Sequence, residues 1–180
     1  MRAITGKYKG RHFSVPNTFK ARPTTDFAKE NIFNVLKSYV DFDGLNALDL
    51  FGGTGSITLE LLSRGAGRVV CIEKDYQHYS FIKQVFRSLN DPNALIFKAD
   101  ALRYINKATQ SFDFIFADPP YALPQLPQLP DLVTNSALMA DDTLFVLEHG
   151  KNLDFSQHPC FIEHRAYGSV NFSLFRKPGD

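Results

Sequence analysis

The stretch ALDLFGGTGS, residues 47–56, decides the fold of this chain. Its first half is short and apolar, which is typical of a buried strand, and residues 57–64 predict a helix directly after it. Between the two, Gly52, Gly53 and Gly55 let the backbone turn sharply and approach a ligand with no side chain in the way. The stretch therefore predicts a strand, a ligand-binding turn and a helix.

From this stretch to the end of the chain, the sequence contains a series of short apolar runs. Long stretches separate the first five of them. These runs are ALDLF (47–51), RVVCIE (68–73), ALIFKA (94–99), FDFIFA (112–117), TLFVLE (143–148), CFIEHRAY (160–167) and VNFSLF (170–175). Helical stretches, clearest at 57–64 and 76–89, favour a parallel sheet covered on both faces. Only Gly168 and Ser169 separate the last two runs, so these pair as an antiparallel hairpin. The predicted fold class is α/β, a doubly wound Rossmann-like sheet of five parallel strands with a C-terminal antiparallel hairpin.

The first 45 residues are expected to add a small hairpin and a helix. Residues 2–15 alternate around the turn-like Lys9-Gly10. Thr25 or Asp26 then caps a helix whose buried face carries Ala28, Ile32, Val35, Leu36 and Tyr39. We expect one domain over residues 1–180, made of a basic N-terminal extension (1–25), a covering helix (26–45) and a core (46–180).

Composition places the chain among soluble globular proteins, with 44% hydrophobic and 22% charged residues. No apolar run approaches the roughly 18 to 20 residues that a bilayer span needs, so we expect a cytoplasmic protein with no membrane contact. Cys71 and Cys160 have no close-spaced His or Cys, so we expect packed thiols and no metal site.

The net charge of +1 hides an asymmetry along the sequence. Residues 1–40 hold eight Lys and Arg against Asp26 and Glu30, whereas the other 140 residues hold 12 basic and 17 acidic side chains. A basic segment on a mildly acidic body is typical of a polyanion-binding protein, most often one that binds nucleic acid. A solvated surface hairpin is the alternative.

The glycine-rich turn is followed by an acid, Glu73, at the end of the second predicted strand, where a carboxylate can accept ribose hydroxyls. A dinucleotide fingerprint would need a third glycine where Thr58 stands. Asp49 adds a second acid, which suits a cationic ligand better than a phosphate. S-adenosylmethionine has a ribose, an amino acid tail and a sulfonium, so it fits this pattern, while a plain tight turn is the alternative. Asp100, after the third strand, is expected near the adenine amino group or as a helix N-cap.

The fourth predicted strand ends in Asp118, Pro119, Pro120 and Tyr121. Prolines donate no hydrogen bond, so the carbonyl of Pro119 stays free to accept one. Together with the Asp118 carboxylate it can hold both hydrogens of a planar amine, while Tyr121 stacks on the ring. The carboxylate also favours the positive charge that develops when the amine nitrogen attacks a methyl sulfonium. An ordinary Asp-Pro turn is the alternative.

In this order these motifs resemble the class I S-adenosylmethionine-dependent N-methyltransferases that act on exocyclic amines. The N-terminal part is similar to the bacterial 16S ribosomal RNA guanine-N2 methyltransferases of the type known as small-subunit methyltransferase D. The likeness is carried by MRAITGKYKGR (1–11), RPTTD (22–26), IFNVL (32–36), DLFGGTG (49–55), LSRGA (62–66), Glu73 and DPPY (118–121). The chain departs from the family at Gly52 and Thr54, where Ala and Ser are more frequent, and in the proline-rich stretch 123–130.

The resemblance implies methylation of a guanine N2 in 16S rRNA, on an assembled or assembling small subunit, by a monomeric enzyme. It implies three sets of residues. Catalytic residues would be Asp118, Pro119, Pro120 and Tyr121. Cofactor residues would be Asp49, Phe51, Gly52, Gly53, Gly55, Glu73, Lys74, Asp100 and Ala101. RNA-binding residues would be Lys7, Lys9, Arg11, Arg22 and Thr24.

Other functions share parts of this pattern. DNA adenine or cytosine methyltransferases use a similar tetrapeptide, but they normally carry an added recognition domain for which 180 residues leave no room. Protein glutamine methyltransferases would have Asn in place of Asp118. A non-catalytic RNA-binding or assembly factor would be expected to have damaged motif residues, and none is evident.

Overall fold

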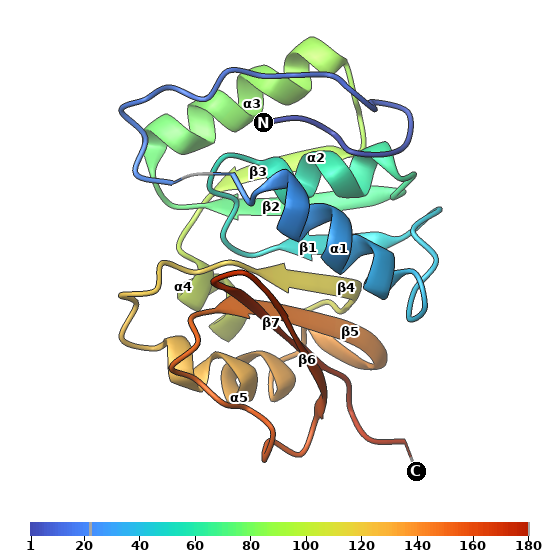
Figure 1. Cartoon of the computed structure of the whole chain (residues 1–180), viewed down its shortest axis with the longest axis vertical. Helices are drawn as coiled ribbons and strands as arrows, with labels where there is room; N and C mark the ends of the chain where they lie inside the picture. The colour runs from blue at the N-terminus through green and yellow to red at the C-terminus, as the bar shows by residue number, and fades with distance from the viewer. Residues whose placement is uncertain (22, 180) are drawn as a thin grey trace.

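The computed structural model describes residues 1–21 and 23–179, and its centre is a seven-stranded sheet. The strand order is β3-β2-β1-β4-β5-β7-β6, and the strands from β3 to β4 follow one another from top to bottom in Figure 1. The strands are β1 (Asn46–Asp49), β2 (Arg68–Glu73), β3 (Ala94–Lys98), β4 (Phe112–Ala117), β5 (Met139–His149), β6 (Phe161–Tyr167) and β7 (Val170–Phe175). The first five are parallel and β7 pairs antiparallel with both β5 and β6, which confirms the predicted fold class.

Helices cover both faces of the sheet, because successive strand residues point to opposite sides. The helices are α1 (Asp26–Leu36), α2 (Ser56–Ser63), α3 (Tyr76–Leu89), α4 (Ala101–Asn106) and α5 (Leu129–Thr134), with the 3-10 turn η1 (Leu126–Gln128) before α5. Val69 and Cys71 of β2 pack with α1, α2 and α3, while Val70 and Ile72 pack with α4 and α5. The two resulting cores fix the sheet between its layers.

Predicted and observed boundaries agree closely in the core. Strands β2, β4 and β7 and helix α3 have the predicted bounds, whereas β5 begins four residues before the predicted Thr143. The added residues of β5 start at Met139, which pairs with Phe112 across a register shift in β4. The proline-rich stretch 123–130 contributes η1 and the start of α5, because proline is compatible with the first turn of a helix.

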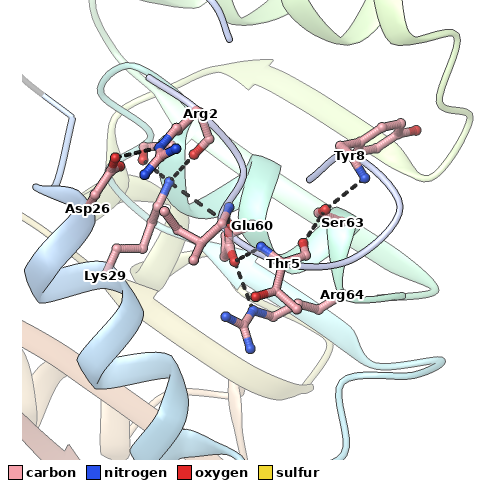
Figure 2. A network of polar contacts seen from close by, with 10 residues as sticks. Arg2, Thr5, Tyr8, Asp26, Lys29, Glu60, Ser63 and Arg64 are labelled. Carbon is pink, nitrogen blue, oxygen red and sulfur yellow. Dashed lines mark hydrogen bonds and ion pairs between the residues drawn. The ribbon is translucent and has the colours of Figure 1, made fainter. Parts of the chain in front are cut away.

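The N-terminal extension differs from the predicted hairpin, since its residues make only isolated bridges, Arg2 with His12 and Ala3 with Lys9. Its backbone also bonds to α2. The amides of Ile4 and Thr5 donate to the carboxylate of Glu60, at 2.8 and 3.2 Å, as Figure 2 shows in part. Some backbone bonds between the two arms of the segment remain, such as the amide of Phe13 to the carbonyl of Met1 at 2.8 Å, and Glu60 adds partners from outside it.

The covering helix α1 begins as predicted, with Thr25 as its N-cap, but its buried face differs in part. Phe33 and Lys29 are buried, while Val35 is only partly so. The Lys29 ammonium donates to the Arg2 carbonyl at 2.6 Å and to the Ser56 hydroxyl at 3.0 Å, so its charged end has partners in the interior. The helix thus ties the N-terminal extension to the start of α2.

Within the residues that the structure describes, no helix has the length and apolar character that crossing a membrane would require.

Candidate active site

A cavity of about 1090 Å³ lies where the parallel strands end, on the side where open α/β sheets bind ligands. Its walls are formed by the glycine-rich turn, by the ends of β2, β4 and β5, and by Lys20, Ala21 and Thr24. Those predicted site residues that line it are Thr24, Phe51, Gly52, Gly53, Glu73, Lys74, Asp100, Ala101, Asp118, Pro119, Pro120 and Tyr121. The fold thus brings these residues from five separate segments of the sequence to a single cavity.

The glycine-rich turn depends on glycine at two positions for different reasons. Gly53 has a φ of +59°, a conformation that side chains disfavour. A Cβ on Gly52 would lie 2.5 Å from the Cys71 sulfur, so the turn packs directly on β2.

Cys71 is a buried free thiol and Cys160 a partly buried one, as packed thiols would be.

Glu73 and Asp100 both line the cavity and both are already hydrogen-bonded to the backbone. Glu73 accepts the amides of Gly53 at 2.6 Å and Asp75 at 3.0 Å, so it fixes the glycine turn against the end of β2. Asp100 caps α4 by accepting the amide of Arg103 at 3.1 Å. The N-cap alternative for Asp100 is therefore present in the structure, and it leaves the residue in the cavity wall.

Asp49 and Gly55 do not line the cavity. Alternation along β1 turns the Asp49 side chain towards α2, where one oxygen accepts the Thr58 hydroxyl at 2.8 Å and the other has no hydrogen-bond donor among the described residues. Burial raises the pKa of Asp49 to about 7. Gly55 instead begins α2 with a φ of +83°. Their predicted direct contact with a cofactor has no support in this arrangement.

Asp118 lies beside a second carboxyl group that sequence reasoning missed, Glu148 at the end of β5. Burial, then the nearby Glu148 carboxylate, raises the pKa of Asp118 well above its usual range. Burial likewise raises the pKa of Glu148 to about 7. The Tyr121 hydroxyl lies 3.4 Å from Glu148 Oε1, and Tyr121, which is 54% exposed, lines the cavity. Two adjacent carboxyls and a flat ring thus face the same space.

A usable signal for Glu148 was present in the sequence. It ends the fifth parallel strand, as Glu73 ends the second and Asp118 follows the fourth, so strand position alone placed it at the same edge of the sheet. Lys20 and Tyr76 also line the cavity and were missed. Lys20 follows an irregular segment, where no periodic pattern indicates which way a side chain points.

The predicted RNA-binding residues occupy two places. Lys7, Lys9 and Arg11 are exposed on the N-terminal extension, and the Lys7 ammonium pairs with Asp91 at 3.0 Å. Thr24 lies in the cavity wall, so the structure does not bring it together with the other three. Arg22 lies outside the described residues.

Known proteins are similar to this chain over most of its length. The sequence profile described as "Conserved hypothetical protein 95" matches residues 1–176. "Putative rRNA methyltransferase YlbH" of Bacillus subtilis (strain 168) is 31% identical, over 99% of this chain and 100% of the relative. "Ribosomal RNA small subunit methyltransferase D" of Escherichia coli (strain K12) is 30% identical, over 82% of this chain and 74% of the relative.

A solved structure, "Putative methyltransferase yhhF from Escherichia coli", superimposes with a TM-score of 0.86 and 26% identity, covering 100% of this chain and 99% of the other. The strand order and the antiparallel C-terminal hairpin are those of the class I methyltransferase fold. On the profile match and the identity of its full-length relatives, the chain belongs to the family described as Conserved hypothetical protein 95, the family of the small-subunit rRNA methyltransferase D proteins.

Proposed function

We propose that this protein transfers a methyl group from S-adenosylmethionine to the exocyclic N2 of a guanine in 16S rRNA, within an assembled or assembling small subunit. The observation that carries the proposal is the position of Asp118 and Pro119 in the same cavity as the glycine turn and Glu73. Acceptors for an amine would thus lie beside a wall that suits a nucleoside. The relatives named above supply the class of RNA.

The cavity suits the proposed cofactor in size and in chemistry. Its volume, about 1090 Å³, is at the upper end for small-molecule sites and leaves room for a nucleoside cofactor and a target base together. Glu73 and Asp100 would hold the ribose and the adenine amine, and the open backbone of Gly53 would face the amino acid tail. S-adenosylmethionine supplies a methyl group on a positively charged sulfur, a charge that the acids of the cavity favour.

At the other end of the cavity, the chain's own groups would prepare the amine. A guanine amine is a weak nucleophile because its lone pair is delocalised into the ring, so holding it in line with the methyl group supplies much of the rate. The Asp118 carboxyl and the Pro119 carbonyl would accept one amine hydrogen each, and Tyr121 would stack on the base. The amine nitrogen would form a bond to the methyl carbon, while the bond between that carbon and the sulfur breaks and its electrons stay on sulfur. The methylated nitrogen would then give one proton to the Asp118–Glu148 pair.

The N-terminal extension would bind the RNA backbone through Lys9 and Arg11, whose side chains are exposed. Contacts of Lys and Arg with phosphate position an RNA without reading its sequence. Base recognition would therefore come from the cavity and from the shape of the particle.

The test is transfer of labelled methyl from S-adenosylmethionine to small-subunit particles that lack the modification, with naked rRNA, DNA and protein in parallel. Nucleoside analysis should find the label as N2-methylguanosine, with particles preferred over naked RNA. Label on another base, on DNA or on protein would overturn the substrate while keeping the reaction. Cofactor binding without any transfer would favour a non-catalytic assembly factor.

A further inference from the structure

We propose that Glu148 identifies the target base by accepting the hydrogen bond of guanine N1–H, beside the N2 amine held at Asp118. The inference rests on the proposed function and deepens it, because it names the residue that distinguishes guanine from the other bases that carry an amine.

The sheet register makes the two carboxyls neighbours. Strands β4 and β5 are parallel and in register at Ala117 and Leu147, so Asp118 and Glu148 are the next residues on adjacent strands. Both line the cavity, and Glu148 is 7% exposed. Two acceptor groups therefore lie side by side at the edge of the sheet where the base is expected.

The hydrogen bonding of Glu148 is incomplete. Its Oε1 has one long contact, with the Tyr121 hydroxyl at 3.4 Å, and its Oε2 is buried with no donor among the described residues. No ion pair within residues 1–21 and 23–179 includes it. A buried carboxyl oxygen without a donor is costly to a folded protein, so an acceptor of this kind at a cavity wall indicates a donor on the ligand.

Guanine supplies the matching donors. Its N1–H lies next to its N2 amine, so the base presents two adjacent groups of donors, whereas adenine and cytosine present a ring nitrogen lone pair next to their amine. With Asp118 and Pro119 on the amine, the neighbouring position falls to Glu148. A carboxylate there attracts N1–H and repels a lone pair.

The experiment compares two nucleosides as inhibitors of methyl transfer to small-subunit particles. Guanosine carries N1–H, while 2,6-diaminopurine riboside keeps the 2-amino group and has a lone pair at N1. For the wild-type protein, the diaminopurine nucleoside should be a weaker inhibitor than guanosine by a factor of about ten or more. In Glu148→Gln this ratio should fall to about threefold or less, because the amide can donate to N1 as well as accept from N1–H. The matched control is Asp142→Asn, an exposed acid on the same strand, which should keep the wild-type ratio.

Calorimetric measurement of S-adenosylmethionine binding verifies that each variant is folded. The ratio of inhibition by the two nucleosides can also be measured on the wild-type protein alone, so this part of the test needs no variant. Equal inhibition of the wild-type protein by both nucleosides, or inhibition by neither, overturns the inference, as does an unchanged ratio in folded Glu148→Gln. In these cases the proposed function stands as long as N2-methylguanosine forms. Absence of that product from the wild-type reaction overturns the proposed function itself, and the inference with it.

Discussion

Two buried glutamates show how this protein uses the same side chain for two purposes. Glu60 on α2 is fully buried and accepts the amides of Ile4 and Thr5 and the Arg64 guanidinium, with Lys29 at 3.9 Å (Figure 2). Glu148 is nearly as buried but has one long contact and one oxygen without a donor among the described residues. The satisfied carboxyl holds segments together, and the unsatisfied one faces a cavity.

The difference in pairing between Glu60 and Glu148 shows that burial alone does not identify a functional acid. Each buried carboxyl costs desolvation, and complete pairing offsets that cost. At Glu60 the partners come from the N-terminal extension, from α1 and from α2, so the extension is part of the folded core. At Glu148 the pairing is left to a ligand, which is typical of a binding site.

The largest expected effect is on stability at Glu60. Glu60→Ala should lower the free energy of unfolding by about 3–5 kcal/mol, because Lys29 and Arg64 lose their buried partner. Urea unfolding measures this, with Glu30→Ala as an exposed control on α1 that should change it by less than about 0.5 kcal/mol. A loss of less than about 1 kcal/mol for Glu60→Ala would contradict the conclusion that the paired Glu60 holds these segments together.

At the cavity, the corresponding change should affect turnover. Asp118→Ala should reduce methyl transfer by at least about 100-fold, because it removes the acceptor for the amine and its developing charge. Affinity for S-adenosylmethionine should stay within about threefold of the wild-type value, as measured by calorimetry. Equal loss of transfer and of cofactor binding would count against assigning Asp118 to the amine.

The incomplete pairing of Glu148 also predicts that stability depends on pH. The pKa of Glu148 is raised from 4.5 to about 7 in the folded protein, so folding binds a proton there between these values. Stability from this group is complete below about pH 4.5 and is lost as pH rises through 7. Glu148→Gln should therefore reduce the fall in unfolding free energy between pH 5 and 8 by about 1–3 kcal/mol. An unchanged pH profile would show that Glu148 is ionised without cost.

On the surface of the N-terminal extension, effects should be smaller and depend on salt. Replacing Lys9 and Arg11 by Gln should weaken RNA binding and reduce the slope of log affinity against log salt by roughly 1.5. Arg103 on α4 and Lys107 directly after it are exposed, and they make a matched pair whose replacement should leave the slope unchanged. Equal slopes for both pairs would return the extension to a purely structural role.

The smallest effect is expected at Tyr121. Its hydroxyl makes only the 3.4 Å contact with Glu148, and its role is assigned to the ring. Tyr121→Phe should keep turnover within about threefold in the same transfer assay. A tenfold loss would mean that the hydroxyl completes the pairing of Glu148 after all.

Much of the core was predictable because its signals are local. The glycine turn, the alternation of apolar runs with helices, and the short Gly168-Ser169 link specify the sheet without long-range information. Strand order and the cavity then follow, because parallel strands bring their carboxyl ends to one edge.

What the sequence did not predict depends on tertiary contacts. The N-terminal extension has an alternating pattern, yet its amides bond to Glu60, more than 50 residues away. Lys29 is buried on a helix face where a charged residue is unexpected, because Arg2 and Ser56 supply its partners. No local pattern encodes such pairings.

The joint role of Asp118 and Glu148 is tested most directly by a crystal structure of the protein with S-adenosylhomocysteine and guanosine. The guanine should lie in the cavity with N2 about 3 Å from both Asp118 and the Pro119 carbonyl, and with N1 about 3 Å from Glu148. A base bound with another edge towards the two carboxyls, or bound elsewhere, would contradict the assignment of both.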